Sequence, residues 1–373
     1  MSELSIDIVS SRADLKGFIN LPWKIYPREC NWVPPLKRDI RHLLDTRKHP
    51  FWKFSEQRLF LARRGGEVVG RIAGIIDNNN NDYHNEKMGV WGFFECMDDQ
   101  EAASALFSAV QDWVTRKGMD FLRGPLNPST NYTVGLLIEG FEYRPTIMMP
   151  WNHPYYVRLV EEAGFTKEKD LKSLIVFEEI KLSPRMDRLV RRLEQRGKVW
   201  SRNGSRKNFQ SEMALIAEIY KSAWADNWGF VPVTPEESVE AGKELTWILV
   251  EGLTYFVYYD QDPAGMIMIA PDFNPLLWRL NGKIGLSGVL KYLLYRREIR
   301  GFRAMLFGVK KRYQKLGIPL VAANHLTKAL KDHPHWEYLE FGWTLEDNDA
   351  INRFLLEGGA KINKQYRVFR KNL

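Results

Sequence analysis

Hydrophobic and polar positions repeat along the chain with two spacings, one typical of strands and one typical of helices. Residues 59–73 read as a strand, a Gly-Gly turn and a second strand, and residues 255–268 repeat this arrangement. A second pair of similar segments covers 159–165 and 354–360. In both pairs the matching glycines are 195 residues apart: Gly70 with Gly265, and Gly164 with Gly359. One shared offset favours an internal duplication, so we expect two α/β units of similar fold.

Between these segments each half is predicted to alternate strands and helices. Residues 100–117 have the helical spacing, because Leu106, Val110 and Trp113 fall on one face. The predicted elements are a strand at 89–97 and a helix at 100–117 in the first half, then strands at 304–309, 336–345 and 365–370 with helices at 319–331 and 349–356 in the second. Residues 276–300 read as an additional helical insertion in the second half.

A basic segment separates the two halves. Residues 181–207 contain ten Lys or Arg against two Asp or Glu, an excess that equals the net charge of +8 of the whole chain. Ser183 is a predicted helix N-cap with Pro184 at the first helical position. Such a segment can bind nucleic acid, anionic lipid or the phosphates of a cofactor, but we favour a solvated linker helix. The predicted domains are therefore 1–180 and 208–373, joined by the linker 181–207.

Composition excludes several classes of protein. The 373 residues are 45% hydrophobic and 27% charged, which is typical of a globular protein. Two cysteines occur, without a Cys-x-x-Cys or His-Glu-x-x-His motif, so we expect neither a disulfide framework nor a metal site. The N-terminus lacks an apolar signal segment, and no run of about 18 apolar residues exists. We therefore expect a cytoplasmic protein without a membrane partner, and the oligomeric state is not predicted.

The strongest chemical signal is a cationic turn between a strand and a helix. The apolar run 304–309 leads into the turn, and a helical pattern begins near Pro319. The first turn of a helix presents unpaired backbone N–H groups and the positive end of the helix dipole, which favour phosphate oxygens. Lys311, Arg312 and Lys315 add formal positive charge. The turn has neither the Gly-Lys-Ser/Thr of a P-loop nor the three glycines of the dinucleotide fingerprint.

This turn resembles the pyrophosphate-binding motif of the GNAT (Gcn5-related N-acetyltransferase) superfamily, an Arg/Gln-x-x-Gly-x-Gly/Ala turn after an apolar strand. Residues 314–318 fit the motif, whereas Pro319 replaces the usual Gly or Ala and removes an N–H donor. Asn348 lies eleven residues before Gly359, as an Asn usually does in this superfamily. The whole chain is similar to bacterial tandem-GNAT proteins. The resemblance implies an α/β (α+β) fold of two GNAT-like domains, each a mixed, largely antiparallel central sheet flanked by helices.

The resemblance also implies a site for acetyl-CoA or another acyl-CoA in the second half. The diphosphate would bind backbone N–H groups of residues 316–320, and an N–H near Gly308 or Val309 would stabilise a developing oxyanion. The first half carries acids at the corresponding positions, among them Asp98 and Asp99, so we expect no cofactor site there. The implied cofactor-binding residues are Gly308, Val309, Lys311, Arg312, Gln314, Lys315, Leu316, Gly317, Ile318, Leu320 and Asn348.

Catalysis would require a base, because an amine acceptor arrives protonated. Glu340 is the first candidate, on the face of the strand 336–345 opposite its apolar residues, and Glu346 is the second. Many family members place a tyrosine acid where this chain has Leu355, so Tyr366 is a speculative substitute. The alternative interpretations are a surface or salt-bridged glutamate for Glu340 and an ordinary sheet tyrosine for Tyr366.

These features favour an acyl-CoA-dependent N-acyltransferase, with acetyl as the expected acyl group and the amine of a small molecule or peptide as acceptor. Two alternatives stay open. One is a Fem-like transferase, which uses two such domains to move an aminoacyl group from tRNA, with residues 181–207 contacting the RNA. The other is a protein that binds CoA or another ligand without catalysis, because Pro319 and Leu355 depart from the family pattern.

Overall fold

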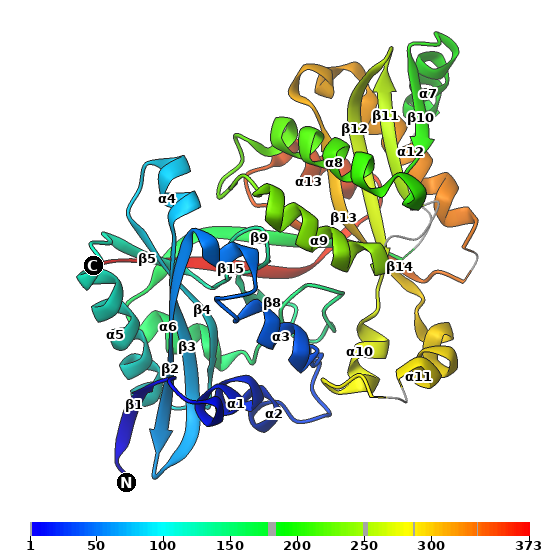
Figure 1. Cartoon of the computed structure of the whole chain (residues 1–373). Coiled ribbons are helices and arrows are strands. Elements are labelled where there is room, and N and C mark those ends of the chain that lie inside the picture. The colour runs from blue at the N-terminus through cyan, green and yellow to red at the C-terminus, as the bar shows by residue number, and fades with distance from the viewer. Residues whose placement is uncertain (1, 178–183, 249–252, 286–287, 334) are drawn as a thin grey trace. The chain divides into compact units, whose positions relative to one another are not determined.

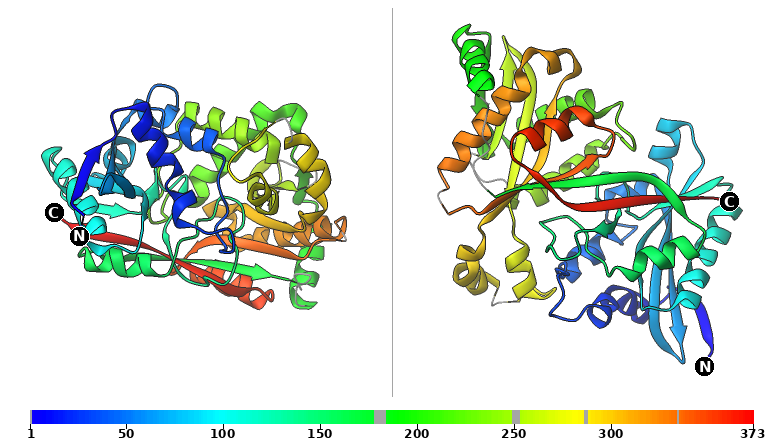
Figure 2. Two further views of the ribbon diagram at one scale, coloured as in Figure 1. Left: turned by 90° about the horizontal axis from the view of Figure 1, so that it is seen from below. Right: turned by 180° about the vertical axis from the view of Figure 1, so that it is seen from behind.

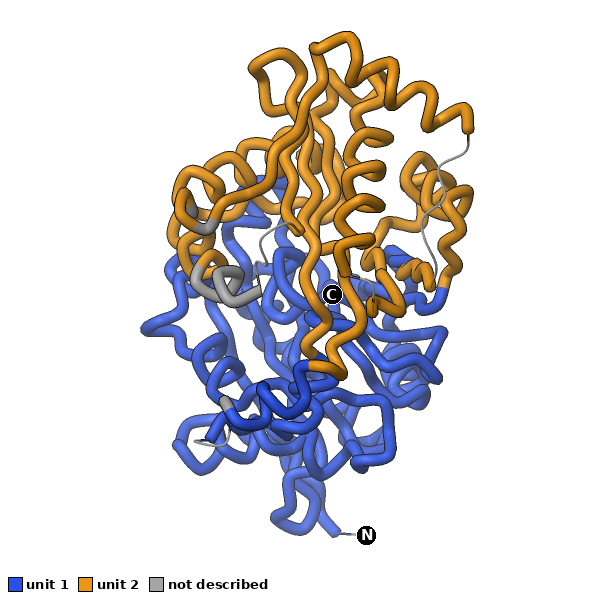
Figure 3. Tube along the Cα trace, turned by 90° about the vertical axis from the view of Figure 1, so that its right-hand side faces the viewer, with its two compact units in different colours: residues 1–172, 274–296, 363–373 blue, residues 173–273, 297–362 orange. Residues whose placement is uncertain are grey.

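The computed structural model describes residues 2–177, 184–248, 253–285, 288–333 and 335–373. The chain forms two compact units (Figure 3). Unit 1 comprises Met1–Lys172, Asn274–Arg296 and Asn363–Leu373, and unit 2 comprises Ser173–Phe273 and Arg297–Ile362. Each unit is therefore built from segments that are separate in the sequence.

Unit 1 contains a largely antiparallel sheet in the order β1-β2-β3-β4-β5-β15-β9, and β8 also pairs with β15 (Figure 1). Strands β4 and β5 pair in parallel. The strands are β1 (Leu4–Ile8), β2 (Ser55–Arg64), β3 (Glu67–Asp77), β4 (Met88–Cys96), β5 (Phe121–Gly124), β8 (Leu136–Glu139), the first part of β9 (Thr166–Val176) and β15 (Lys361–Asn372). A separate two-stranded sheet joins β6 (Leu126–Asn127) to β7 (Thr133–Val134).

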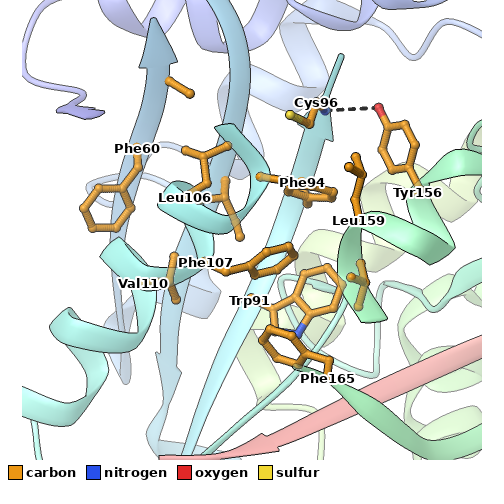
Figure 4. Packing of buried hydrophobic residues seen from close by; sticks show 14 of the residues in the cluster. Phe60, Trp91, Phe94, Cys96, Leu106, Phe107, Val110, Tyr156, Leu159 and Phe165 are labelled. Atoms are coloured by element: carbon orange, nitrogen blue, oxygen red, sulfur yellow. Dashed lines mark hydrogen bonds between the residues drawn. The ribbon is translucent and has the colours of Figure 1, made fainter. Parts of the chain in front are cut away.

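Helix α5 forms the main core of unit 1 with this sheet. The helices of the unit are α1 (Arg12–Asn20), α2 (Pro22–Ile25), α3 (Lys37–Leu43), α4 (Asn78–His84), α5 (Gln100–Arg116), α6 (Tyr155–Glu162), α10 (Asn274–Leu280) and α11 (Gly288–Tyr295), with a 3₁₀ turn at η1 (Pro50–Lys53). A glycine in β3 allows the close approach of α5, because a Cβ on Gly70 would lie 2.8 Å from Leu106 Cδ1. Trp91, Phe107 and Phe165 pack edge to face in the centre of this core (Figure 4).

The strands of unit 2 pair in the order β10-β11-β12-β13-β14, followed by the end of β9. Its pairs are antiparallel from β10 to β13, and β13 pairs with β14 in parallel. The strands are β10 (Val199–Asn203), β11 (Thr254–Tyr259), β12 (Asp262–Pro271), β13 (Gly301–Val309) and β14 (Tyr338–Leu345). The helices are α7 (Pro184–Gln195), α8 (Phe209–Trp224), α9 (Pro235–Ile248), α12 (Ile318–Lys331) and α13 (Asp349–Glu357), with 3₁₀ turns at η2 (Arg206–Asn208), η3 (Arg296–Glu298) and η4 (Lys311–Leu316).

Alternation along β12 places helices on both faces of the strands of unit 2 (Figure 1). Met266 belongs to one apolar cluster with Ile219 of α8. Its neighbour Ile267 points the other way and belongs to a cluster with Leu326 of α12. A strand buried on both faces reads as a continuous apolar run, which is the pattern of residues 264–270.

The predicted strands and helices of both halves are confirmed, as is the expectation of mixed, largely antiparallel sheets flanked by helices. Ser183, the predicted N-cap of the helix that begins at Pro184, lies outside the described residues. The predicted segments 89–97, 100–117, 304–309, 319–331, 336–345, 349–356 and 365–370 correspond to β4, α5, the end of β13, α12, β14, α13 and part of β15.

Two segments belong to a different unit from the one that their sequence position suggests. Strand β15 pairs with β5, where Phe369 faces Gly124, and lies beside β9 (Figure 2). The insertion 276–300 forms helices as predicted, but Asn274–Arg296 belongs to unit 1. This corrects the expected extent of the second domain, 208–373. Periodicity identifies a strand or helix but contains no information about the partner on which it packs.

The basic segment is part of unit 2 wherever the structure describes it. Val190 of α7 is fully buried in an apolar cluster with residues of α12. Strand β10 pairs along β11, with Val199 opposite Tyr259. These contacts correct the expectation of a solvated linker, although Arg188 and Arg192 of α7 remain exposed.

Candidate functional site

Strands β13 and β14 of unit 2 run side by side and then separate. Their parallel pairing ends at Ala304 and Phe341. Directly before that point the residues of both strands are buried. Beyond it, the exposure increases, and Met305–Phe307 of β13 and residues 342–344 of β14 are only half-buried. The register between β12 and β13 also shifts at Met305, which is the extra residue of a bulge. Separated strands beside a bulge leave an edge of β13 at which a ligand can form backbone hydrogen bonds.

The cationic turn follows directly from this edge. It consists of η4 and of Gly317, whose φ of 77° is left-handed and favours glycine. Pro319 has no N–H, and the N–H of Leu320 donates to Gly317 O at 3.0 Å. Of the five residues predicted to hold a diphosphate, at most the three at 316–318 can therefore offer a backbone N–H to a ligand.

A leucine of α7 covers one side of the turn. A Cβ on Gly317 would lie 2.6 Å from Leu193 Cδ1, so the leucine packs directly on the glycine. Leu193 extends the apolar cluster between α7 and α12. Packing of this leucine therefore closes the N-terminus of α12 on this side. An anion could approach from the side of residues 314–316, which are exposed.

The Asp262 carboxylate binds three side chains of the turn. Lys310 is buried, and its Nζ lies 3.3 Å from Asp262 Oδ1 and 2.6 Å from Glu218 Oε1. The Tyr313 hydroxyl donates to Asp262 Oδ2 at 2.5 Å, and Arg312 pairs with the same carboxylate. Partial burial raises the pKa of Asp262, but the hydrogen bonds from these three side chains outweigh it and hold the pKa below its usual value. The aspartate thus fixes the turn and neutralises part of its charge.

Three cations remain exposed on the turn. Lys311 and Arg312 each pair with an aspartate. Lys315 has no ion-pair partner within the described ranges, so it is the cation most available to an anionic ligand. The Gln314 side-chain amide donates to Val309 O at 3.1 Å and fastens the turn to the end of β13.

An apolar pocket lies beside the point where β13 and β14 separate. Its volume of about 10 Å³ is that of one water-sized probe, so a larger group would have to displace side chains. Phe307 and Phe354, two of its lining residues, are only half-buried. The lining includes Ile267, Phe307, Leu326, Phe341, Phe354 and Leu355, all apolar.

Both candidate bases are on or directly after β14. Glu340 is 1% exposed, and its Oε1 accepts a hydrogen bond of 2.6 Å from Ser173 Oγ. Arg303, its partner in the parallel register, donates to Gly342 O at 2.7 Å. Glu346 follows the strand and is half-exposed. A buried Glu340 can exchange protons only with a molecule that enters between the strands, whereas Glu346 meets solvent.

Several predicted site residues have structural roles. Asn348 caps α13, because its Oδ1 accepts from Ile351 N at 3.5 Å. Gly308 packs under Trp224, whose ring would lie 2.1 Å from an added Cβ. Tyr366 is fully buried in β15 of unit 1, whereas every other predicted site residue belongs to unit 2.

The corresponding opening in unit 1 is filled by the chain itself. The parallel pairing of β4 with β5 ends at Val90. Beyond it, the side-chain oxygen of Asn127 accepts from Phe93 N at 2.5 Å. A Cβ on Gly92 would lie only 1.9 Å from Leu126 O. The segment Leu126–Asn127 thus occupies the edge of β4 that corresponds to the open edge of β13.

Carboxylates surround the start of α5, the helix that corresponds to α12. Asp99 caps α5 by accepting from Ala102 N at 3.0 Å. Arg64 neutralises part of this charge, because it bonds to Asp99 at 2.8 Å and to Glu101 at 2.8 Å. A phosphate at this helix start would meet acids in place of the cations found in unit 2.

A buried polar cluster lies next to the filled opening. Glu95 Oε2 accepts hydrogen bonds from Tyr26 at 2.6 Å and Tyr156 at 2.8 Å, and Arg71 lies 3.6 Å from Glu95 Oε1. The Tyr156 hydroxyl also accepts from Cys96 N at 3.2 Å (Figure 4). Burial raises the pKa of Glu95 above its usual value, although Arg71 and the tyrosines oppose the shift.

Sequence reasoning missed four of these features. Ser173 beside the candidate base and Asn127 in the filled opening leave no local pattern, because each acts on a segment distant in the sequence. Leu193 lies on the apolar stripe predicted for its helix, but that stripe does not identify Gly317 as its partner. Glu95 does leave a signal, since it is a charged residue inside an otherwise apolar strand. Such a residue indicates a buried partner.

Solved structures with the same fold are GNAT proteins. A tandem GNAT protein from the clavulanic acid biosynthesis pathway superposes with a TM-score of 0.56 at 11% identity, over 99% of this chain and 98% of that one. A GCN5-related N-acetyltransferase from Anabaena variabilis reaches 0.51 at 11% identity, over 99% of this chain and 72% of that one. At such identities the likeness shows the fold alone. No protein-family model matches the chain.

Two curated proteins are similar over the full length. Protein YghO of Escherichia coli K12 is 33% identical over 370 residues, which is 97% of this chain and 94% of YghO. The bacterial ceramide synthase of Caulobacter vibrioides is 32% identical over an alignment of 379 residues, which covers 100% of this chain and 98% of the synthase. The chain has the fold of a tandem GNAT protein, and it belongs to the family of YghO and this ceramide synthase.

Proposed function

We propose that the protein is an N-acyltransferase that moves a fatty acyl group from acyl-CoA to the amine of a long-chain amino alcohol. The observation that carries the proposal is the full-length similarity to a bacterial ceramide synthase. A ceramide is the amide of a fatty acid with such an amino alcohol, and the GNAT superfamily is known for acyl transfer to amines. The proposal replaces the expected acetyl group with a longer acyl group.

Unit 2 offers the better site for acyl-CoA. Its β13 edge is open at Met305–Phe307, and the exposed Lys315 stands on the following turn. The same edge in unit 1 is covered by Leu126–Asn127, and carboxylates surround the helix that follows. The residues of unit 2 fit the diphosphate of acyl-CoA in part, because Leu193 limits the approach to Gly317. Acyl-CoA would supply the activated thioester.

The lining of the apolar pocket has the character that an acyl chain requires. It contains no polar side chain that would need a partner. Its present volume is small, so entry of a chain would require Phe307 and Phe354 to move apart. Each methylene that such a pocket buries adds roughly 0.8 kcal/mol of binding energy. We propose that the two aromatic side chains move apart on binding and that long chains are therefore preferred.

The chain must also remove a proton from the attacking amine. The reaction forms an amide N–C bond, breaks the thioester C–S bond and leaves a thiol. We assign Glu340 as the base, with Ser173 holding the carboxylate in place. Glu346, which is closer to solvent, is the second candidate. Tyr366 is a weaker candidate for the acid, because it belongs to unit 1.

The test is an assay of free thiol and of amide product with the purified protein. Acetyl-CoA, octanoyl-CoA and palmitoyl-CoA are each combined with sphinganine, and with ethanolamine and a lysine-containing peptide as acceptor controls. We expect thiol release and an N-acyl product with palmitoyl-CoA and sphinganine. Product formation only with short acyl groups or short amines would refute the lipid assignment. Acyl-CoA binding without product from any pair would favour the non-catalytic alternative.

A further inference from the structure

Helix α11 exposes apolar side chains and turns its lysine inward. Leu290, Leu293 and Leu294 have the i, i+3, i+4 spacing of one helix face, and they are 59%, 53% and 62% exposed. Tyr292 and the preceding Ile284 are also exposed. A helix on a globular protein normally buries such a face, so three adjacent leucines in water mark an interaction surface.

The opposite side of α11 is polar and faces other residues of unit 1. Lys291 Nζ donates to Arg279 O at 3.5 Å. Lys291 and Tyr295 line an open groove with Trp278 and Arg28. The inward side of α11 therefore faces a polar and aromatic groove, which Glu29 and Arg279 also line, and not an apolar surface.

The position of the helical pair is fixed by contacts within unit 1. Leu276 and Leu280 of α10 form an apolar cluster with Leu36, and Tyr295 of α11 packs against it. The side chain of Asn281, which follows α10, accepts from Trp23 Nε1 at 2.9 Å. With the pair α10 and α11 held in this way (Figure 1), the three leucines of α11 remain exposed.

The charge of this segment selects the kind of partner. Residues 274–296 contain four basic residues and no Asp or Glu. Lys283 and Arg296 are exposed, and in the sequence they lie before and after the exposed leucines of α11. Leucines that enter a bilayer interface, flanked by cations that reach anionic headgroups, are the pattern of peripheral membrane helices.

We propose that the leucine face of α11 docks on the surface of an anionic lipid bilayer. A second copy of the chain fits less well, because a two-fold contact would bring the same basic segments together. Among the described helices none is long and apolar enough to cross a bilayer, and α11 has eight residues. The contact is therefore peripheral. It revises the expectation of no membrane partner, and it does not depend on the proposed reaction.

The experiment is co-sedimentation of the full chain with vesicles. One set consists of phosphatidylcholine alone, and the other of equal parts phosphatidylcholine and phosphatidylglycerol. We expect at least about fivefold tighter binding to the anionic vesicles. Replacing all three leucines by serine (L290S, L293S and L294S) should weaken binding by at least about tenfold. Lys283→Glu with Arg296→Glu should remove the preference for anionic lipid.

Val239→Ser with Leu356→Ser is the matched control. Both residues are exposed apolar side chains, on α9 and α13. This variant should bind like the wild type, and all variants should keep its unfolding temperature because the changed side chains are exposed. Equal binding by the wild type and the leucine variant would overturn the proposal, as would wild-type binding to neither vesicle or to both equally. If the wild type is a dimer and the three leucine substitutions dissociate it, the leucine face binds a second copy of the chain. That result would also overturn the proposal.

Discussion

Removal of Lys315 should weaken the binding of acyl-CoA more than removal of any other cation on the turn between β13 and α12. The prediction rests on how the charges are paired. Lys311 and Arg312 already bond to aspartates, and Lys310 is buried between two acids. Lys315 is exposed and has no ion-pair partner in the described chain, so it can meet a phosphate without giving up another contact.

The magnitude follows from the exposure of the lysine. An exposed ion pair is worth at most about 1 kcal/mol, because solvent and salt screen it. Lys315→Ala should therefore raise the Kd of CoA about fivefold. Lys311→Ala should raise it by about twofold, because the lysine must first leave Asp226. Changing Lys311, Arg312 and Lys315 together should raise the Kd by on the order of tenfold and leave the fold intact.

Isothermal titration with CoA measures these values, and pantetheine is the control ligand. Pantetheine lacks the diphosphate, so its affinity should be the same for the wild type and Lys315→Ala. Lys328→Ala is the control variant, because Lys328 is exposed near the opposite end of the same helix. Equal losses for CoA and pantetheine would mean that the lysine supports the fold and not the diphosphate. An unchanged CoA affinity in the triple variant would refute the placement of the phosphate site.

Three further predictions test the base, the turn and the buried cluster. Glu340→Gln should lower kcat by about 100-fold or more without changing the Kd of CoA, and an unchanged kcat in steady-state assays would exclude this base. Gly317→Ala should lower the free energy of unfolding in urea by about 2 kcal/mol, because an alanine there is strained at φ 77° and meets a leucine of α7. Gly359→Ala, with open space at φ 94°, should cost less, and equal losses would show that the leucine is unimportant. The pKa of Glu95 is raised in the folded state. Above about pH 4.3 the unfolded state loses the proton of this carboxyl, whereas the folded state still keeps it. The stability that Glu95 contributes therefore falls as the pH rises through the folded-state pKa. The unfolding temperature of Glu95→Gln relative to the wild type should therefore rise with pH, and a flat difference would mean that the pKa is not raised.

Local patterns in the sequence predicted the elements of the site. Gly301–Val309 and Ile318–Lys331 are a buried strand and an amphipathic helix with clear spacings, and Gly317 between them is the residue that a left-handed turn requires. The three exposed cations were visible for the same reason, because they are adjacent in the sequence. The duplication was visible from matching glycines, and the tandem GNAT fold confirms it.

Contacts between distant segments could not be predicted in this way. The pairing of β15 with β5 and β8 depends on hydrogen bonds to strands more than 200 residues earlier in the chain. The closure of the turn by Leu193 and of the first opening by Asn127 each depends on one side chain whose partner lies elsewhere. The acids that neutralise the turn, Asp226 and Asp262, come from the end of α8 and the start of β12. Neither position has a local pattern that identifies its role.

Hydrogen–deuterium exchange with and without palmitoyl-CoA tests most directly whether unit 2 holds the acyl donor. Binding at the separated strands should slow amide exchange in peptides covering residues 305–320. Peptides covering residues 92–102 of unit 1 should be unchanged, because the chain already fills that opening. Protection of residues 92–102 with none at 305–320 would contradict the assignment, as would the absence of protection in both regions at a saturating concentration of the ligand.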